Sequence, residues 1–340
     1  MPASVAQRTR RRLAWQLLWL GLLLGVAGLA AGSDGWSLPA LWQLVSGPDA
    51  GLVIGQIRAP RTVGAWLVGS LLGLAGAVAQ GLFRNPLADP YLLGSASGAS
   101  LGVVLVLGAG ALTGHRLSLS NLDALMRLGL VGAAFAGSVC GVTLTLALAR
   151  GAQHTARLLL AGVVVGVVLG AGSDMVTTLA PDALSGKQSF LLGSTSFLGW
   201  EGCALLATGL LLSLPPAWRL SRALDALSLG EDSAATLGLA LGKVRALLVA
   251  AMALATAIAV SQSGLIAFVG LVAPHLVRRF APSAHGYQVV ASTAMGGALL
   301  LAADVLARSL VAPQELPVGV LTAVLGGGYL LWLLHRGRRA

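Results

Sequence analysis

The sequence predicts an all-α polytopic membrane protein with about ten transmembrane helices. Of its 340 residues, 56% are hydrophobic and only 10% are charged, whereas a soluble domain carries about 25% charged residues. The apolar residues form long blocks, many of about 18 residues or more, and such a block spans a bilayer core of roughly 30 Å. The alternating segments of about ten residues that are typical of a transmembrane β-barrel do not occur.

The hydrophobic blocks place the spans within a single transmembrane domain, residues 1–340. The block after the basic stretch RTRRR is about 20 residues long, which favours a retained helix over the alternative, a cleaved signal peptide. The eighth span has only fourteen residues and could be tilted or partly buried. The ten predicted spans are 13–32, 62–83, 91–112, 124–149, 157–180, 197–214, 243–262, 264–277, 288–311 and 317–334.

The 46 glycines often recur at four-residue spacing. Small residues at this spacing let helix backbones approach closely inside a membrane, so they predict a tight bundle. The predicted contact sites are Gly69 with Gly73, Gly98 with Gly102, Gly137 with Gly141, and the series Gly162, Gly166 and Gly170.

The basic residues orient the chain. Its net charge of +10 would suggest nucleic acid in a soluble protein, but in a membrane protein it indicates basic cytoplasmic loops. With both termini in the cytoplasm, 16 of the 22 lysines and arginines lie inside. The six outer ones are Arg58, Arg61, Arg116, Arg127, Lys187 and Arg308.

Three of the outer cations have an acid shortly before them in the sequence, and the first two are at the i,i+4 spacing of a helical ion pair. Arg58 and Arg61 have no acid within eight residues on either side. They are either interfacial anchors or a docking site for an acidic partner outside. The three cations with a nearby acid are Arg127 after Asp123, Arg308 after Asp304, and Lys187 after Asp182.

The chain lacks an energy source of its own. Neither Gly-Lys pair lies in a nucleotide-binding loop, because a glycine five residues earlier and a following Ser or Thr are both missing. Asp174, Glu201 and Asp304 map near the outer ends of their spans, whereas an ion-coupled transporter carries charges near the midplane. Cys140 and Cys203 lie far apart and predict no metal site or cofactor. We therefore expect a transporter that is not an enzyme and whose energy is supplied by another protein.

The longest inner loop, about 215–242, predicts two short amphipathic helices with a turn at Gly230. Apolar residues repeat at helical spacing on both sides of the turn, and two acids follow it, where a helix N-terminus favours negative charge. The pair either lies on the bilayer surface or contacts a cytoplasmic partner. Its residues of interest are Leu220, Leu224, Leu227, Glu231, Asp232, Ala234, Ala235, Leu237 and Gly238.

These motifs together resemble those of the FecCD-type permeases of ABC importers, the family that includes the iron–siderophore, heme and vitamin B12 permeases. The resemblance runs from about residue 55 to residue 335, and its first motif has Ala59 where the family usually has leucine. The motifs are RAPR (58–61), RNPLADPYLLGSASGASLG (84–102), LSLGEDSAATLG (227–238), GLIAFVGLVAPHLVRR (264–279) and ELPVGVLTAVLGG (315–327).

The resemblance implies a type II ABC importer permease in a bacterial inner membrane. It would work as a homodimer with two cytoplasmic ATPase subunits below and a periplasmic substrate-binding protein above. Arg58, Arg61 and Arg308 match arginines that dock the binding protein, and the segment 224–238 matches the helices that couple to the ATPase. Gln153, His154 and Thr155 match the cytoplasmic gate region.

The sequence leaves three points to weigh: the importer class, the substrate and the energy source. A second importer class begins its coupling loop with a similar Glu and Gly, but no proline follows here until Pro274, which disfavours that class. The motifs at 85–94 and 264–275 favour an iron–siderophore complex as the substrate, with cobalamin or heme as the alternatives. A self-powered secondary transporter is disfavoured by the missing midplane charges.

Overall fold

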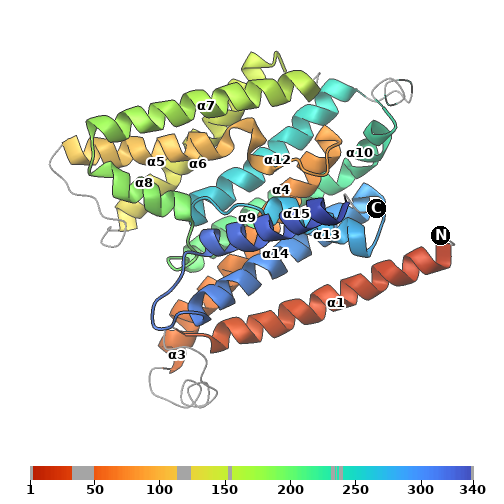
Figure 1. Ribbon diagram of the computed structural model, residues 1–340, viewed down its shortest axis with the longest axis horizontal. Coiled ribbons are helices and arrows are strands. Elements are labelled where there is room, and N and C mark those ends of the chain that lie inside the picture. The colour runs from red at the N-terminus through yellow and green to blue at the C-terminus, as the bar shows by residue number, and fades with distance from the viewer. Residues whose placement is uncertain are drawn as a thin grey trace.

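The computed structural model describes residues 3–32, 50–112, 124–151, 155–230, 234, 236 and 240–337. These residues form helices and their connections, with no β-strand among them. Figure 1 shows the long helices running side by side in one bundle. The bundle is all-α, as the sequence predicts.

Most of the helices run the length of the bundle, and several short ones join them. A six-residue π-helical turn, η1, leads directly into α4, and a 3₁₀ turn, η2, leads into α5. The elements are α1 (Ala3–Ala30), α3 (Ala50–Leu52), η1 (Val53–Arg58), α4 (Ala59–Phe83), η2 (Pro90–Leu93), α5 (Ser95–Leu112), α6 (Ala124–Leu148), α7 (Thr155–Leu179), α8 (Ala183–Leu192), α9 (Trp200–Arg219), α10 (Ser221–Ser228), α12 (Leu241–Ser263), α13 (Val269–Phe280), α14 (His285–Ser309) and α15 (Val318–Gly337).

Each predicted span overlaps one of these helices. Among the described residues, six helical segments are long and apolar enough to cross a membrane alone, namely α1, η1 with α4, α6, α7, α12 and α14. The helices α5 and α15 are shorter, and α9 is bent by 47° against α10. The short predicted eighth span is α13, which has only 12 residues. The count of about ten is therefore approximate.

One helix was not predicted. The segment around Lys187, expected to be a loop, is the helix α8, and Lys187 pairs with Asp174 at the end of α7 rather than with the nearer Asp182. The apolar stretch of α8 is too short to be recognised as a span. Its helical geometry turns Lys187 toward the neighbouring helix.

Helix α4 forms the centre of the bundle. Of its 25 residues, 22 are buried, and it packs against α14, α12, α13 and α9. Pro60 lies in the first turn of α4, directly after η1. A helix that is apolar on all sides can lie in a protein core or face lipid, and the packing places α4 in the core.

Glycines allow this close packing at most of the predicted sites. A Cβ added at Gly73 would lie 2.2 Å from the carbonyl oxygen of Ser292 on α14, and one at Gly98 would lie 2.1 Å from that of Gly137 on α6. Gly162 is equally tight against Leu92. The prediction is not met within the chain at Gly166 and Gly170: an added Cβ would lie 3.7 Å from Ser97 Oγ at the first and have no atom within 4 Å at the second.

Candidate functional site

The charged cluster, defined here as Arg58, Arg61, Asp304, Arg308 and Glu315, lies at one end of the bundle. It joins the starts of α4 and α15, the end of α14 and the end of α1. The amino terminus and α10 lie at the opposite end (Figure 1). Two of the three predicted docking arginines, Arg61 and Arg308, therefore lie together. The third, Arg58, lies beside them, because it and Arg308 both contact the end of α1.

Asp304 is the centre of this cluster. Its carboxylate is fully buried and accepts hydrogen bonds from Arg61 Nε at 3.2 Å and Nη2 at 3.1 Å, and from Arg308 Nη2 at 2.6 Å. Thr195 donates a further bond at 2.6 Å from the connection between α8 and α9. Removing one partner of such a buried pair typically costs about 3–5 kcal/mol, because a buried charge stays uncompensated.

Glu315 holds the other side of Arg61. Nη1 of Arg61 lies 2.9 Å from both carboxylate oxygens of Glu315, and Ser196 donates to one of them at 3.0 Å. The Glu315 side chain keeps 29% of its surface exposed. Water can therefore replace this contact, and an ion pair of that kind is worth about 0–1 kcal/mol. The two acids that bind Arg61 thus hold it with very different strength.

Arg308 and Arg58 close the end of α1. Nη1 of Arg308 donates to the carbonyls of Gly28 at 3.0 Å and Ala31 at 3.1 Å. Nη1 of Arg58 donates to those of Leu29 at 3.1 Å and Ala30 at 3.2 Å. The last carbonyls of a helix have no partner within it and carry partial negative charge. Two arginines from other helices therefore supply the C-terminal cap of α1.

Gly32 makes room for this cap. A Cβ at Gly32 would lie 2.2 Å from Nη2 of Arg58, so a larger residue would push the guanidinium off the two carbonyls. A Cβ at Gly21, on the same helix, would have no atom within 4 Å. The requirement for glycine is thus local to the end of α1.

The sequence missed these partners. It paired Arg308 with Asp304 correctly, but it assigned no acid to Arg61, whose partners are 243 and 254 residues away. Arg61 is only 9% exposed and Arg308 only 2%, so neither projects freely from the surface. Glu315 is the first residue of the recognised motif ELPVGV, and this motif was the feature of the sequence that could have indicated Glu315 as a partner of Arg61.

At the opposite end, α10 confirms the first predicted amphipathic helix of the inner loop. Leu224 and Leu227 are buried at 0% and 1% exposure and pack into the core, while Leu229 is 71% exposed. Gly230 has a positive φ of 115°, which favours glycine, so the turn lies where the sequence places it. Ala234 is buried. Four further residues of the predicted coupling set, Glu231, Asp232, Leu237 and Gly238, lie outside the described residues.

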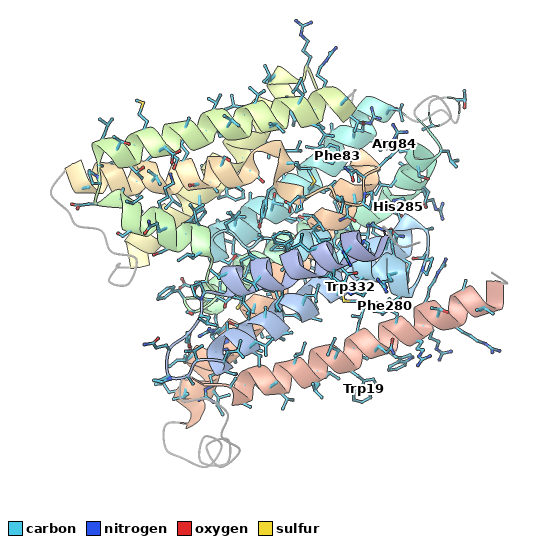
Figure 2. All side chains as sticks on the ribbon, in the orientation of Figure 1. Trp19, Phe83, Arg84, Phe280, His285 and Trp332 are labelled. Atoms are coloured by element: carbon cyan, nitrogen blue, oxygen red, sulfur yellow. The ribbon has the colours of Figure 1, made fainter. Side chains whose placement is uncertain are left out.

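A hydrogen-bonded pair ties α10 to α14. Asp225 accepts from the backbone N–H of His285 at 3.0 Å, and its carboxylate lies 2.7 Å from His285 Nδ1. His285 is the first residue of α14, where a carboxylate is favoured by the exposed N–H groups and the helix dipole. Figure 2 labels His285 at the end of the bundle that holds α10. These contacts link α10 to the start of α14.

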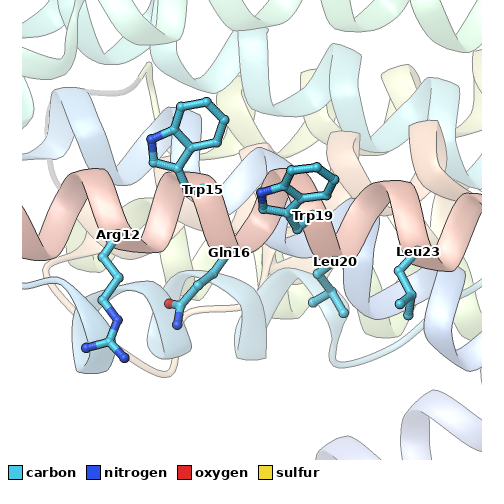
Figure 3. Close-up of a pocket in the computed structure, with 6 residues that line it drawn as sticks. All are labelled: Arg12, Trp15, Gln16, Trp19, Leu20 and Leu23. Atoms are coloured by element: carbon cyan, nitrogen blue, oxygen red, sulfur yellow. The ribbon is translucent and has the colours of Figure 1, made fainter.

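Of the predicted gate residues, Gln153 and His154 lie outside the described residues, and Thr155 begins α7. Among the described residues, no group of three or more His, Cys, Asp or Glu side chains could hold a metal ion. A shallow hollow of about 530 Å³ on the outward face of α1 contains none of the predicted site residues. It is lined by Arg12, Trp15, Gln16, Trp19, Leu20 and Leu23 (Figure 3).

The fold defines a multi-spanning helical membrane protein with a cluster of charged side chains at one end of its bundle. Residues 18–336 match the FecCD transport family. The chain is 39% identical over 330 residues to the hemin transport system permease HmuU of Yersinia pestis, and the match covers 95% of each protein. It is 37% identical over 344 residues to the vitamin B12 import system permease BtuC of Citrobacter koseri, covering 100% of this chain and 99% of that one.

A solved structure of a metal-chelate type ABC transporter in an inward-facing conformation superposes with a TM-score of 0.83. The two chains are 27% identical, and the match covers 96% of this chain and 99% of the other. The PsaBC complex of Streptococcus pneumoniae shares the fold at a TM-score of 0.56 and 16% identity. The chain belongs to the FecCD transport family and is a permease subunit of an ABC importer with the type II fold.

Proposed function

We propose that this permease imports a large metal chelate from a periplasmic binding protein into the cytoplasm, with an iron–siderophore complex as the substrate to be tested first. The full-length similarity to the hemin and vitamin B12 permeases carries this proposal. The same similarity makes heme and cobalamin the second candidates. The protein would lie in the bacterial inner membrane with both termini in the cytoplasm.

Uptake into liposomes tests this function. Two copies of the permease are reconstituted with two ATPase subunits, and the binding protein is added outside with radiolabelled ferric siderophore, heme or cobalamin in separate arms. We expect uptake of one chelate that requires ATP, the ATPase and the binding protein. Uptake by the permease alone under an ion gradient would overturn the proposal in favour of a secondary transporter.

We propose that the charged cluster lies on the outer face and docks the binding protein through acidic side chains. Arg58 is the best probe, because among the described residues it bonds only the carbonyls of α1, whereas Arg61 and Arg308 also hold buried Asp304. Arg58→Glu should weaken docking, and reversing a lobe glutamate of the binding protein should partly restore it. Unchanged affinity for Arg58→Glu would place the docking surface elsewhere.

At the cytoplasmic end, we propose that the segment 224–238 couples the permease to the ATPase and that Gln153, His154 and Thr155 line the gate. The link between Asp225 and His285 supports a route from α10 into α14. Cysteines at 153–155, in a variant without Cys140 and Cys203, should react with a thiol reagent at rates that differ between nucleotide-free and ATP-bound transporter. Equal rates in both states would remove these residues from the gate.

A further inference from the structure

Asp304 and Glu315 hold Arg61 with different strength. This difference determines which of the two contacts an incoming acidic side chain can replace. Arg61 uses Nε and Nη2 for Asp304, which is fully buried, and Nη1 for Glu315. If the Asp304 contact opened, a buried carboxylate would lose one of its two guanidinium partners and could not replace it with water, whereas the Glu315 carboxylate can return to water. Only Nη1 of Arg61 is therefore available for exchange.

Glu315 also has the chemistry of a docking acid. It presents both carboxylate oxygens to Nη1 at 2.9 Å, as a glutamate from another protein would. We propose that Glu315 is an intramolecular stand-in for that glutamate: an acidic side chain of the docked protein takes over Nη1 of Arg61 and releases Glu315. This inference rests on the proposed docking function and deepens it.

Release of Glu315 from Arg61 would affect the start of α15. Glu315 lies in the connection between α14 and α15, three residues before α15 begins at Val318. Besides Arg61, it binds Ser196 in the connection that precedes α9. Among the described residues, the nearby backbone bond from Leu316 N–H to Ala307 O, at 3.0 Å, would remain. Exchange of the acid bound to Arg61 thus frees the segment around Glu315 and leaves the rest of the charged cluster in place. In this way docking is coupled to the outer end of α15.

The first test uses the purified permease in nanodiscs without a partner. Phenylglyoxal, an arginine-selective reagent, is applied, and modification of each arginine is followed by peptide mass spectrometry. Glu315→Gln should speed modification of Arg61 about fivefold, the factor expected from losing one part-exposed ion pair, while Arg308 stays slow. Ser196→Ala is the matched control, because it alters the surroundings of Glu315 but keeps its charge. An unchanged Arg61 rate in Glu315→Gln would overturn the inference.

The second test measures docking of the importer's own unloaded binding protein to the assembled transporter. Glu315→Gln should tighten docking about fivefold, because the competing carboxylate is gone. The docked binding protein should protect Arg61 from phenylglyoxal in the wild type. Equal or weaker docking by Glu315→Gln, with docking by Arg58→Glu impaired, would overturn this inference alone. Unchanged docking in Arg58→Glu would instead overturn the proposed docking face.

Discussion

Arg61 on α4 and Asp304 on α14 form a buried ion pair, 3.1 Å apart between Nη2 and Oδ1, although 243 residues separate them in the chain. The pair joins the two helices that make the central contact of the bundle. Asp304 also binds Arg308 at 2.6 Å, so one carboxylate binds two guanidinium groups. Arg61, which we propose as a docking arginine, is thus also a structural residue.

Asp304→Asn should therefore destabilise the permease strongly. The amide cannot neutralise Arg61 and Arg308, and the loss should be about 3–5 kcal/mol, as for other broken buried pairs. Thermal unfolding in detergent, followed by fluorescence size-exclusion chromatography, measures it. Glu315→Gln is the matched control and should lose no more than about 1 kcal/mol. Equal losses in the two variants would contradict the assignment of Asp304 as the buried anchor.

Gly32→Ala should loosen the end of α1. The new methyl group would displace the Arg58 guanidinium, which lies 2.2 Å from the position of that Cβ, and would uncap the carbonyls of Leu29 and Ala30. Hydrogen exchange by mass spectrometry should show faster exchange in peptides that cover the last turn of α1. Gly21→Ala, which meets no atom within 4 Å, should leave these peptides unchanged. The same exchange rate in both variants would argue against the arginine cap.

Leu229→Asp should uncouple ATP hydrolysis from uptake and leave the protein folded. Leu229 is 71% exposed beside the turn at Gly230, while Leu227 is 1% exposed. Leu227→Asp would bury a charge and is expected to prevent folding, so it cannot serve as a test of coupling. ATPase activity and uptake are measured in the same proteoliposomes. Normal uptake by Leu229→Asp would show that α10 is a surface helix without a coupling role.

Trp19 should contact lipid. Trp19 is 65% exposed on α1, and its side chain points away from the bundle (Figure 2). The hollow that Trp19 helps to line faces the same way. Brominated phospholipids in the nanodisc should quench tryptophan fluorescence, and Trp19→Phe should remove a larger share of the quenchable signal than Trp66→Phe. Trp66 packs against the core. A larger effect of Trp66→Phe would indicate that another protein surface, such as a second copy, covers this face of α1.

Part of the candidate site could be predicted from the sequence. The pairing of Arg308 with Asp304 follows from their spacing on one helix, and the leucine spacing predicts α10. The partners of Arg61 could not be predicted in this way, because they depend on which helix ends meet. The residue types at the acceptor positions do not reveal the carbonyl cap of α1, since the acceptors are backbone oxygens.

The sequence by itself determined the class of the protein. The length of its apolar blocks predicts membrane-spanning helices, and its motifs place it in a transport family. Both signals are local, so they are readable without the fold. Only the tertiary structure decided what Arg58, Arg61 and Arg308 do within the chain. Packing brings Asp304 and Glu315 to Arg61 and the end of α1 to Arg58 and Arg308, and buried charges must be neutralised wherever the fold places them.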